Sequence, residues 1–216
     1  NTLIGVGAPA ENNSAGAFYI FSDINLTSDI DSGDALKQVT GSVTERFGKT
    51  VASYGDIDKD NKNDIVFANP NSESISILLG SAIETYSTQS ELITLTADTL
   101  ALENANARYF GNQIAIAGDI NGDGYDDILI GGSKKTTDTT NTNGRAYLIF
   151  GQDSFNSLEN GNIATDSDII FEGTSSTEFT GYSVDILPDI NRDGYDEIII
   201  SSFDQNSQVG HNVYLI

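Results

Sequence analysis

The chain has 216 residues and a formal net charge of −22, from 32 acidic and 10 basic residues, which excludes binding to nucleic acid or anionic membranes through general electrostatics. It contains no cysteine, so no disulfide stabilises the fold. No run of 18 apolar residues is present, which excludes a membrane-spanning helix.

Short apolar runs rich in Ile, Val, Phe and Tyr recur along the chain and are separated by Gly, Asn, Ser and Thr. Runs of this length and composition favour strands over helices. Leu100–Ala107 is the best candidate for a helix, and it is short. We expect fourteen strands in sets of three, four, four and three, within residues 3–9, 16–21 and 36–41; 46–56, 64–70, 74–80 and 91–98; 108–119, 127–133, 144–151 and 167–173; and 178–189, 197–203 and 209–216.

The recurring order of these runs defines an internal repeat. We expect one domain with repeats at residues 1–41 (partial), 42–104, 105–173 and 174–216 (partial). Four-stranded units of this length, arranged radially, are the blades of a β-propeller. The predicted fold class is therefore an all-β propeller, of which about three and a half to four blades are present. Because an open array exposes strand edges, we expect further blades or another chain to complete it.

Three acidic loops stand between the first and second strands of the predicted blades. Loop 1 is DIDKDNKND (residues 56–64), loop 2 is DINGDGYDD (119–127) and loop 3 is DINRDGYDE (189–197). Each carries oxygen-bearing side chains at positions 1, 3, 5 and 9, and Gly or Asn at position 6. Clustered carboxylates repel one another unless a cation lies between them, and an oxygen-only ligand set selects Ca²⁺ over softer metals. An Asx-rich turn would explain one such loop, but three in register predict a repeated calcium-binding unit.

We predict three Ca²⁺ sites, each with four side-chain ligands and the backbone carbonyl of position 7. The ligands are Asp56, Asp58, Asp60, Asp64 and the Lys62 carbonyl in loop 1; Asp119, Asn121, Asp123, Asp127 and the Tyr125 carbonyl in loop 2; and Asp189, Asn191, Asp193, Glu197 and the Tyr195 carbonyl in loop 3. Asp196 is an alternative to Glu197. Loop 1 has the most carboxylates among its ligands, so we expect it to bind most tightly.

The loops also have a predicted backbone geometry. Position 6, occupied by Asn61, Gly124 and Gly194, requires a positive φ, which these residue types tolerate best. EF-hand loops are excluded, because position 12 is apolar in all three repeats rather than Glu.

No catalytic centre is recognisable. His211 is the single histidine and lies in a predicted strand, which excludes a His-based metal centre. Gly48-Lys49-Thr50 lacks the upstream glycine of a phosphate-binding loop. We therefore expect no enzymatic activity.

Phe47-Gly48 and Phe110-Gly111, each followed by an acidic loop, together with Gly7-Ala8-Pro9, resemble FG-GAP repeats. Those repeats build the seven-bladed propeller of integrin α subunits and of related bacterial surface proteins. The resemblance implies that each acidic loop joins the first two strands of a blade and binds Ca²⁺ on one face of the propeller. The third repeat departs from the pattern with Phe179-Thr180-Gly181, and an intact Gly-Ala-Pro occurs only in the N-terminal repeat. These departures, with the lack of cysteine, favour a bacterial or divergent member.

The resemblance and the calcium loops lead to an expected function. We expect a secreted or cell-surface module that adheres to a protein or glycan ligand on a cell or matrix surface, since extracellular fluid is rich in calcium. Recognition is expected in loops such as Lys134–Asn143 or Asn12–Ser14. Two alternatives stay open: an accessory propeller of a secreted lipid- or polysaccharide-cleaving enzyme, and a structural subunit of a surface assembly.

Overall fold

The computed structural model describes residues 3–22, 31–41, 46–85, 92–97, 110–116, 118–132, 143–155, 158, 161–174, 178–203 and 212–216. Three features predicted from the sequence lie outside these residues: the short helix Leu100–Ala107, His211, and the Lys134–Asn143 loop except Asn143 itself.

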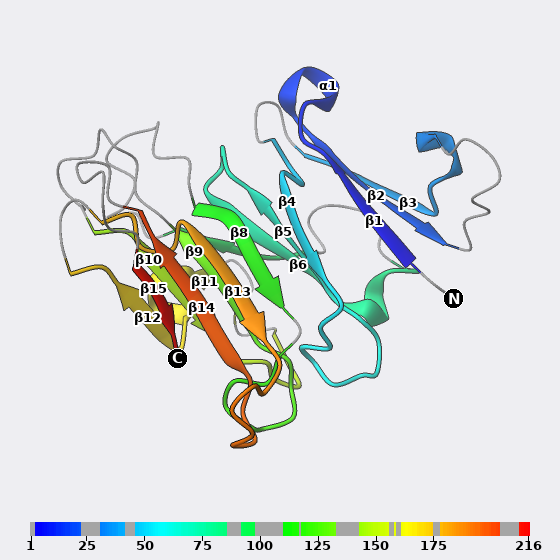
Figure 1. Ribbon diagram of the computed structural model, residues 1–216. Helices are drawn as coiled ribbons and strands as arrows, with labels where there is room; N and C mark the ends of the chain where they lie inside the picture. The colour runs from blue at the N-terminus through cyan, green and yellow to red at the C-terminus, as the bar shows by residue number, and fades with distance from the viewer. Residues whose placement is uncertain are drawn as a thin grey trace.

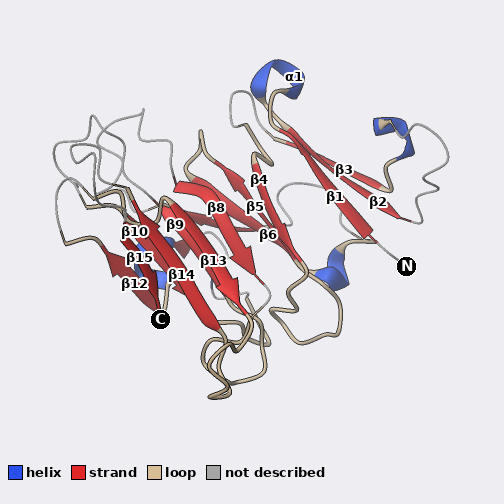
Figure 2. Cartoon of the chain, viewed as in Figure 1, coloured by secondary structure: helices blue, strands red, loops and turns tan. Residues whose placement is uncertain are grey.

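Strands dominate the described residues, and they form four sheets in which nearly all pairs are antiparallel (Figure 2). The first sheet has the order β1 (Leu3–Ala8), β2 (Ala17–Ser22), β3 (Lys37–Thr40); the second contains β4 (Thr50–Ser53), β5 (Ile65–Asn69), β6 (Ser74–Leu78) and β7 (Ile93–Thr96); the third contains β8 (Phe110–Ile116), β9 (Ile128–Gly132), β10 (Arg145–Ile149) and β12 (Ile169–Glu172); and the fourth contains β13 (Ser183–Leu187), β14 (Glu197–Ser202) and β15 (Asn212–Leu215). All fourteen predicted strands are present, which confirms the all-β class.

One strand was not predicted. The two-residue β11 (Gly161–Asn162) comes from the third repeat but pairs in parallel with β7 at the edge of the second sheet. The helical segments in the described residues are all short: α1 (Glu11–Ser14), η1 (Ser32–Asp34), η2 (Gly80–Ala82) and α2 (Ile163–Asp166).

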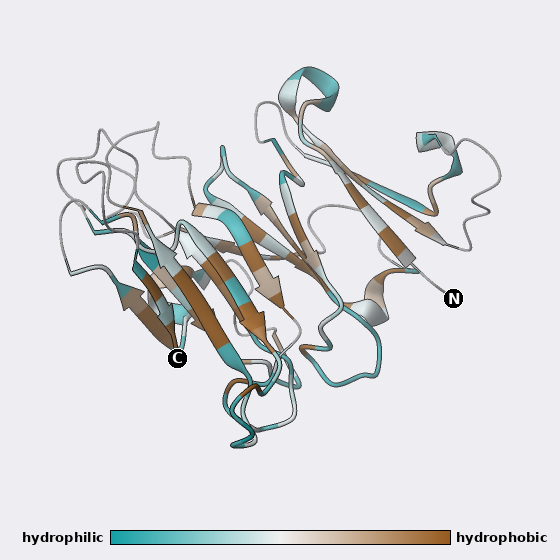
Figure 3. Cartoon of the chain, in the orientation of Figure 1, coloured by the Kyte–Doolittle hydropathy of each residue, from teal (hydrophilic) through white to brown (hydrophobic). Residues whose placement is uncertain are grey.

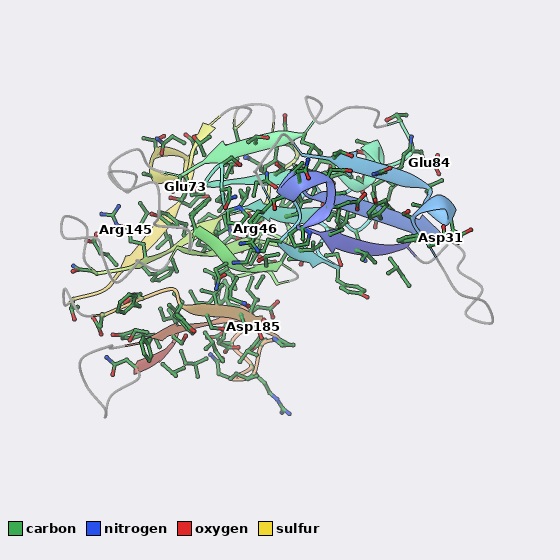
Figure 4. The ribbon with its side chains drawn as sticks, turned by 90° about the horizontal axis from the view of Figure 1, so that it is seen from above. Asp31, Arg46, Glu73, Glu84, Arg145 and Asp185 are labelled. Atoms are coloured by element: carbon green, nitrogen blue, oxygen red, sulfur yellow. The ribbon has the colours of Figure 1, made fainter. Side chains whose placement is uncertain are left out.

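The four sheets lie side by side in chain order (Figure 1). Their leading strands are neighbours: β1 contacts β4, β4 contacts β8, and β8 contacts β13. Viewed from above, side chains fill the spaces between the sheets, and Arg46 is labelled at the junction of the first two (Figure 4), where its N–H donates to the Ser14 carbonyl at 3.0 Å. The described residues form an open array and not a closed ring.

The two central sheets bury both faces, one against each neighbouring sheet. On β5, Val66 belongs to the core shared with the third sheet, whereas Phe67 belongs to the core shared with the first. The Phe67 ring stacks on Phe18 at a centroid distance of 5.2 Å and meets the edge of Phe47 at 4.7 Å. A strand buried on both faces needs apolar residues at every position, which explains why these strands appear in the sequence as continuous apolar runs (Figure 3).

Small residues allow the sheets to approach closely at one end. At each junction, a glycine at or just before the first strand of one sheet packs against a small residue on β1, β5 or β9 of the preceding sheet. A Cβ added at Gly7 would lie 1.9 Å from the Gly48 carbonyl oxygen, and one added at Gly131 would lie 2.4 Å from that of Gly181. The three junction pairs are Gly7 with Gly48, Ala68 with Gly111, and Gly131 with Gly181.

The departure in the third repeat preserves this junction. Gly181 has φ +79°, close to the +72° of Gly48, so the glycine keeps its place. Thr180 takes the position of Phe47, since Thr180 bridges to Gly144 as Phe47 bridges to Gly16. The inserted threonine therefore displaces Phe179 by one residue without altering the glycine contact.

Candidate metal centre

The three acidic loops extend from the same end of the array. Loop 1 joins β4 to β5, loop 2 joins β8 to β9, and loop 3 joins β13 to β14. They lie together beneath the sheets in Figure 1 and form much of the hydrophilic edge in Figure 3. Each loop therefore connects the first two strands of its sheet, as the resemblance implied.

The carboxylate at position 1 organises each loop by accepting backbone N–H groups from within it. Asp56 accepts from Asp60 N at 2.9 Å and from Asn61 N at 2.8 Å. Asp119 accepts in the same way from positions 5 and 6 at 3.0 and 2.7 Å, and Asp189 does so at 3.1 and 2.9 Å. The three loops thus share one backbone conformation.

In loops 1 and 2, the position 9 carboxylate connects the loop to the body of its sheet. Asp64 is fully buried, and its two oxygens accept from Ile57 N at 2.7 Å and Gly80 N at 2.6 Å. Asp127 is equally buried and accepts from Ile120 N at 2.7 Å and Gly151 N at 2.8 Å.

Loop 3 keeps the bond to position 2 of this pattern, with a longer side chain at position 9. Glu197 is 5% exposed and accepts from Ile190 N at 2.9 Å. The neighbouring Asp196 accepts instead from Asp189 N at 2.8 Å. Glu197 therefore makes the contact with position 2 that Asp64 and Asp127 make, whereas Asp196 accepts from position 1.

Positions 5 and 7 are coupled by hydrogen bonds. The position 5 carboxylate accepts from the N–H of position 7, at 2.8 Å for Asp60 with Lys62, and at 3.0 Å for Asp123 with Tyr125 and for Asp193 with Tyr195. At position 3, Asp58 and Asn121 accept from the N–H of position 5 at 3.2 and 3.0 Å. Asn191, the counterpart in loop 3, is exposed.

Two positions in each loop have a left-handed backbone. Position 6 has φ values of +63° at Asn61, +86° at Gly124 and +98° at Gly194, as predicted. Position 4 also has positive φ, at Lys59, Gly122 and Arg192 (+60°, +77° and +66°). The sequence signals position 4 only in loop 2, where it is glycine.

The arrangement of loop 1 fits a hard divalent cation. Asp56, Asp58 and Asp64 each offer an oxygen within 4.8 Å of the others, and among the described residues this is the single such group of three or more acidic, His or Cys side chains. Asp60 is not part of this group. In loop 2, Asn121 Nδ2 donates to Asp123 Oδ2 at 2.8 Å, so the amide oxygen, which already accepts from Asp123 N, is the Asn121 atom with a second lone pair to offer a cation.

Burial makes the charge of these carboxylates costly without a cation. Desolvation raises the pKa of Asp64 from 3.8 to about 7, although hydrogen bonds from Gly80 and Ile57 oppose the rise. Desolvation likewise raises the pKa of Asp127 to about 6. Burial and the nearby charge of Asp60 raise the pKa of Asp58. A bound dication would remove this penalty.

A cavity of about 1090 Å³ opens beside loop 1, between the first and second sheets. Its lining includes Leu36, Tyr54, Lys62 and Glu84. Tyr54 is 77% exposed and has φ +90°, a conformation that non-glycine residues rarely adopt. An exposed aromatic ring held by a strained backbone is typical of a binding surface rather than of a core.

Comparison with known families agrees with this geometry. Residues 110–149 match the family model of the FG-GAP repeat, and they comprise β8, loop 2, β9 and β10. The chain therefore contains an FG-GAP repeat, which confirms the resemblance. No curated protein sequence matches the chain. No helix among the described residues has both the length and the hydropathy needed to cross a bilayer.

Proposed function

We propose that this chain is a calcium-binding β-propeller module that adheres to a protein or glycan at a cell or matrix surface. The observation that carries the proposal is the acidic group of loop 1, in which Asp56, Asp58 and Asp64 oxygens lie within 4.8 Å of one another. Loops 2 and 3 repeat the same backbone hydrogen bonds, which supports one Ca²⁺ in each loop.

The ion has a structural role in this proposal. When bound, Ca²⁺ supplies positive charge that neutralises and cross-links the carboxylates of a loop. The buried Asp64 and Asp127 connect the loops to Gly80 and Gly151, which follow the third strands of their sheets. Calcium occupancy is therefore coupled to the stability of the sheets. Loops that need calcium suit an extracellular setting, where the ion is abundant.

Two observations support the propeller arrangement. The leading strands of the four sheets are neighbours, as they are around the axis of a propeller. Apolar side chains are also exposed on the outermost sheets, with Val6 at 45%, Val213 at 64% and Leu215 at 56%. Such faces favour cover by further blades or by another chain.

Partner binding is best assigned to the cavity beside loop 1. It combines the exposed Tyr54 ring with charged groups of both signs, Lys62 and Glu84, and aromatic rings with nearby polar groups suit both protein and sugar ligands. Because Lys62 belongs to loop 1, calcium binding there would fix one wall of the cavity. We assign the module no catalytic activity.

The test is a binding screen of the full chain against immobilised glycans and matrix proteins, with calcium and with EGTA. We expect a ligand that is retained in calcium, released in EGTA, and bound at least tenfold more weakly by Tyr54→Ala. Tyr182→Ala is the matched control, because Tyr182 is 49% exposed but lies at the fourth sheet. Binding that is indifferent to both calcium and Tyr54, or cleavage of the immobilised ligand, would contradict the proposal.

A further inference from the structure

The three acidic loops contact one another through position 8, to which the sequence assigned no role except as an alternative ligand in loop 3. Asp126, at position 8 of loop 2, accepts the N–H of Asp56 at 2.7 Å, and its own N–H donates to the Asp56 carbonyl at 3.2 Å. Asp196, at position 8 of loop 3, accepts the N–H of Asp119 at 3.0 Å and donates to the Asp119 carbonyl at 3.1 Å. The same paired contact therefore joins loop 1 to loop 2 and loop 2 to loop 3.

Each contact connects residues that belong to two different predicted metal sites. Asp56 is the position 1 ligand of loop 1, and its carboxylate orders positions 5 and 6 of that loop. Asp126 stands between Tyr125 and Asp127, the position 7 and position 9 ligands of loop 2. A cation in loop 2 would fix residues 125–127, and with them the acceptor that holds the backbone of Asp56.

A second contact between the loops runs parallel to the first. Lys59 Nζ, from position 4 of loop 1, lies 4.9 Å from the centroid of the Tyr125 ring and donates to the Asp123 carbonyl at 3.3 Å. At the next junction the Tyr195 ring covers Gly122 so closely that an added Cβ would lie 2.6 Å from Tyr195 Cε1. Position 4 of one loop thus packs under position 7 of the next, at both junctions.

We infer that Asp126 and Asp196 are positioning residues that couple the metal sites of neighbouring loops, so that occupancy of one loop raises the affinity of the adjacent one. The inference rests on the proposed calcium binding and adds cooperativity between its sites. Ordering of a shared backbone by the first ion reduces the entropy that the second must remove. The coupling is reciprocal by thermodynamic linkage.

The coupling between loops 1 and 2 is measured by calorimetric calcium titration of the full chain with loop 3 silenced by Asp193→Ala. In that background, loop 1 affinity is compared with loop 2 intact and with loop 2 silenced by Asp123→Ala, which leaves the Asp123 carbonyl available to Lys59. We expect loop 1 to weaken roughly fivefold or more when loop 2 is silent. Silencing loop 1 with Asp58→Ala should weaken loop 2 by the same factor.

Substitution of Asp126 tests whether this residue transmits the effect. The quantity compared is the affinity ratio, which is the calcium affinity of loop 1 with loop 2 intact divided by that with loop 2 silenced. Asp126→Ala removes the acceptor of the Asp56 N–H and should bring this affinity ratio close to one. Asp126→Asn keeps an acceptor oxygen, so its affinity ratio should stay close to that of the parent. Asn63→Ala changes position 8 of loop 1, which does not lie at the junction of loops 1 and 2, and should leave the ratio unchanged.

A metal-free measurement supplements the titrations. Hydrogen exchange of the Asp56 amide in EGTA should accelerate in Asp126→Ala but not in Asp126→Asn. If Asp126→Ala does not fold, the Asp196→Ala and Asp196→Asn pair gives the same comparison for loops 2 and 3.

The outcomes separate the inference from the proposed function. If the parent protein takes up no calcium, the proposed function fails and the inference fails with it. If the parent binds calcium but the affinity ratio is one, or is the same in Asp126→Ala as in the parent, the inference alone is overturned.

Discussion

Replacing Asp64 by Asn should affect the stability of the protein in opposite directions in the absence and in the presence of calcium, which tests the role of Asp64 in loop 1. Asn has nearly the same shape as Asp and keeps one carbonyl oxygen to accept from Ile57 N or Gly80 N. It removes the negative charge that burial makes unfavourable. The variant should therefore gain stability without calcium and lose the stabilisation that calcium provides.

The magnitudes follow from the environment of Asp64. A pKa raised from 3.8 to about 7 corresponds to about 4 kcal/mol against the ionised form at pH 8, an upper limit because solvent screens part of the loop. The loss of one charge-assisted hydrogen bond offsets about 2 kcal/mol of this. The metal-free variant should thus be more stable by up to about 2 kcal/mol, or roughly 4–8 °C in Tm. Calcium at about a hundred times Kd should stabilise loop 1 of the parent by about 2.7 kcal/mol, which the variant lacks.

The assay is thermal unfolding at pH 8 of the parent and Asp64→Asn, each in EGTA and in calcium. Asp185→Asn is the control, because Asp185 (labelled in Figure 4) is exposed on β13 of the fourth sheet, whereas loop 1 belongs to the second sheet. A variant that melts well below the parent in EGTA would show that its hydrogen bonds outweigh the cost of the buried charge. A variant that gains as much from calcium as the parent would refute the assignment of Asp64 as a ligand.

Three further predictions concern pH, backbone strain and the sheet junctions. Because folding raises the Asp64 pKa to about 7, the folded metal-free chain binds a proton more tightly than the unfolded chain, so its stability should increase as pH falls from 8 to 5. The calcium affinity of loop 1 should fall about tenfold per pH unit below 7. Calorimetry that shows no such fall in affinity would contradict the raised pKa. Arg192→Gly should raise Tm by roughly 2–4 °C, because glycine relieves the positive φ of +66°, and a lower Tm would count against strain at position 4. Gly131→Ala should lower the free energy of unfolding by about 2–3 kcal/mol in a denaturant titration, since its Cβ would lie 2.4 Å from a carbonyl oxygen. The control Gly194→Ala, whose Cβ meets nothing within 4 Å, should cost only the strain of its φ, about 1–2 kcal/mol. Equal losses of stability in the two variants would refute the steric explanation.

The strands could be predicted because burial on two faces imposes a simple pattern. β5 and β9 lie in the two central sheets, with a neighbouring sheet packed against each face, so apolar residues fill nearly every position. Strand ends were less predictable: the run at residues 46–56 yields only Thr50–Ser53, because Phe47 and Gly48 form the sheet junction instead. β11 was missed because Gly161 and Asn162 carry no apolar signal and pair with a different repeat.

The loops were predictable where a residue acts within its own loop. The oxygen-bearing side chains at positions 1, 3, 5 and 9 can be recognised directly in the sequence, and so can the Gly or Asn at position 6, which tolerates a positive φ. The contact made by Asp126 could not be recognised in the sequence, because its partner is the backbone of Asp56, 70 residues away. The contact of Asp196 with the adjacent loop also required the structure, because its partner is the Asp119 N–H, 77 residues away.

The most direct test of the central claim, that calcium stabilises this β-sheet array through its acidic loops, is a calorimetric titration of the metal-free chain with calcium, followed by melting of the titrated sample. We predict uptake of three Ca²⁺ per chain and a rise in Tm of about 5–10 °C for each filled site at a hundredfold excess over Kd. A titration without saturable heat, together with an unchanged Tm, would contradict it.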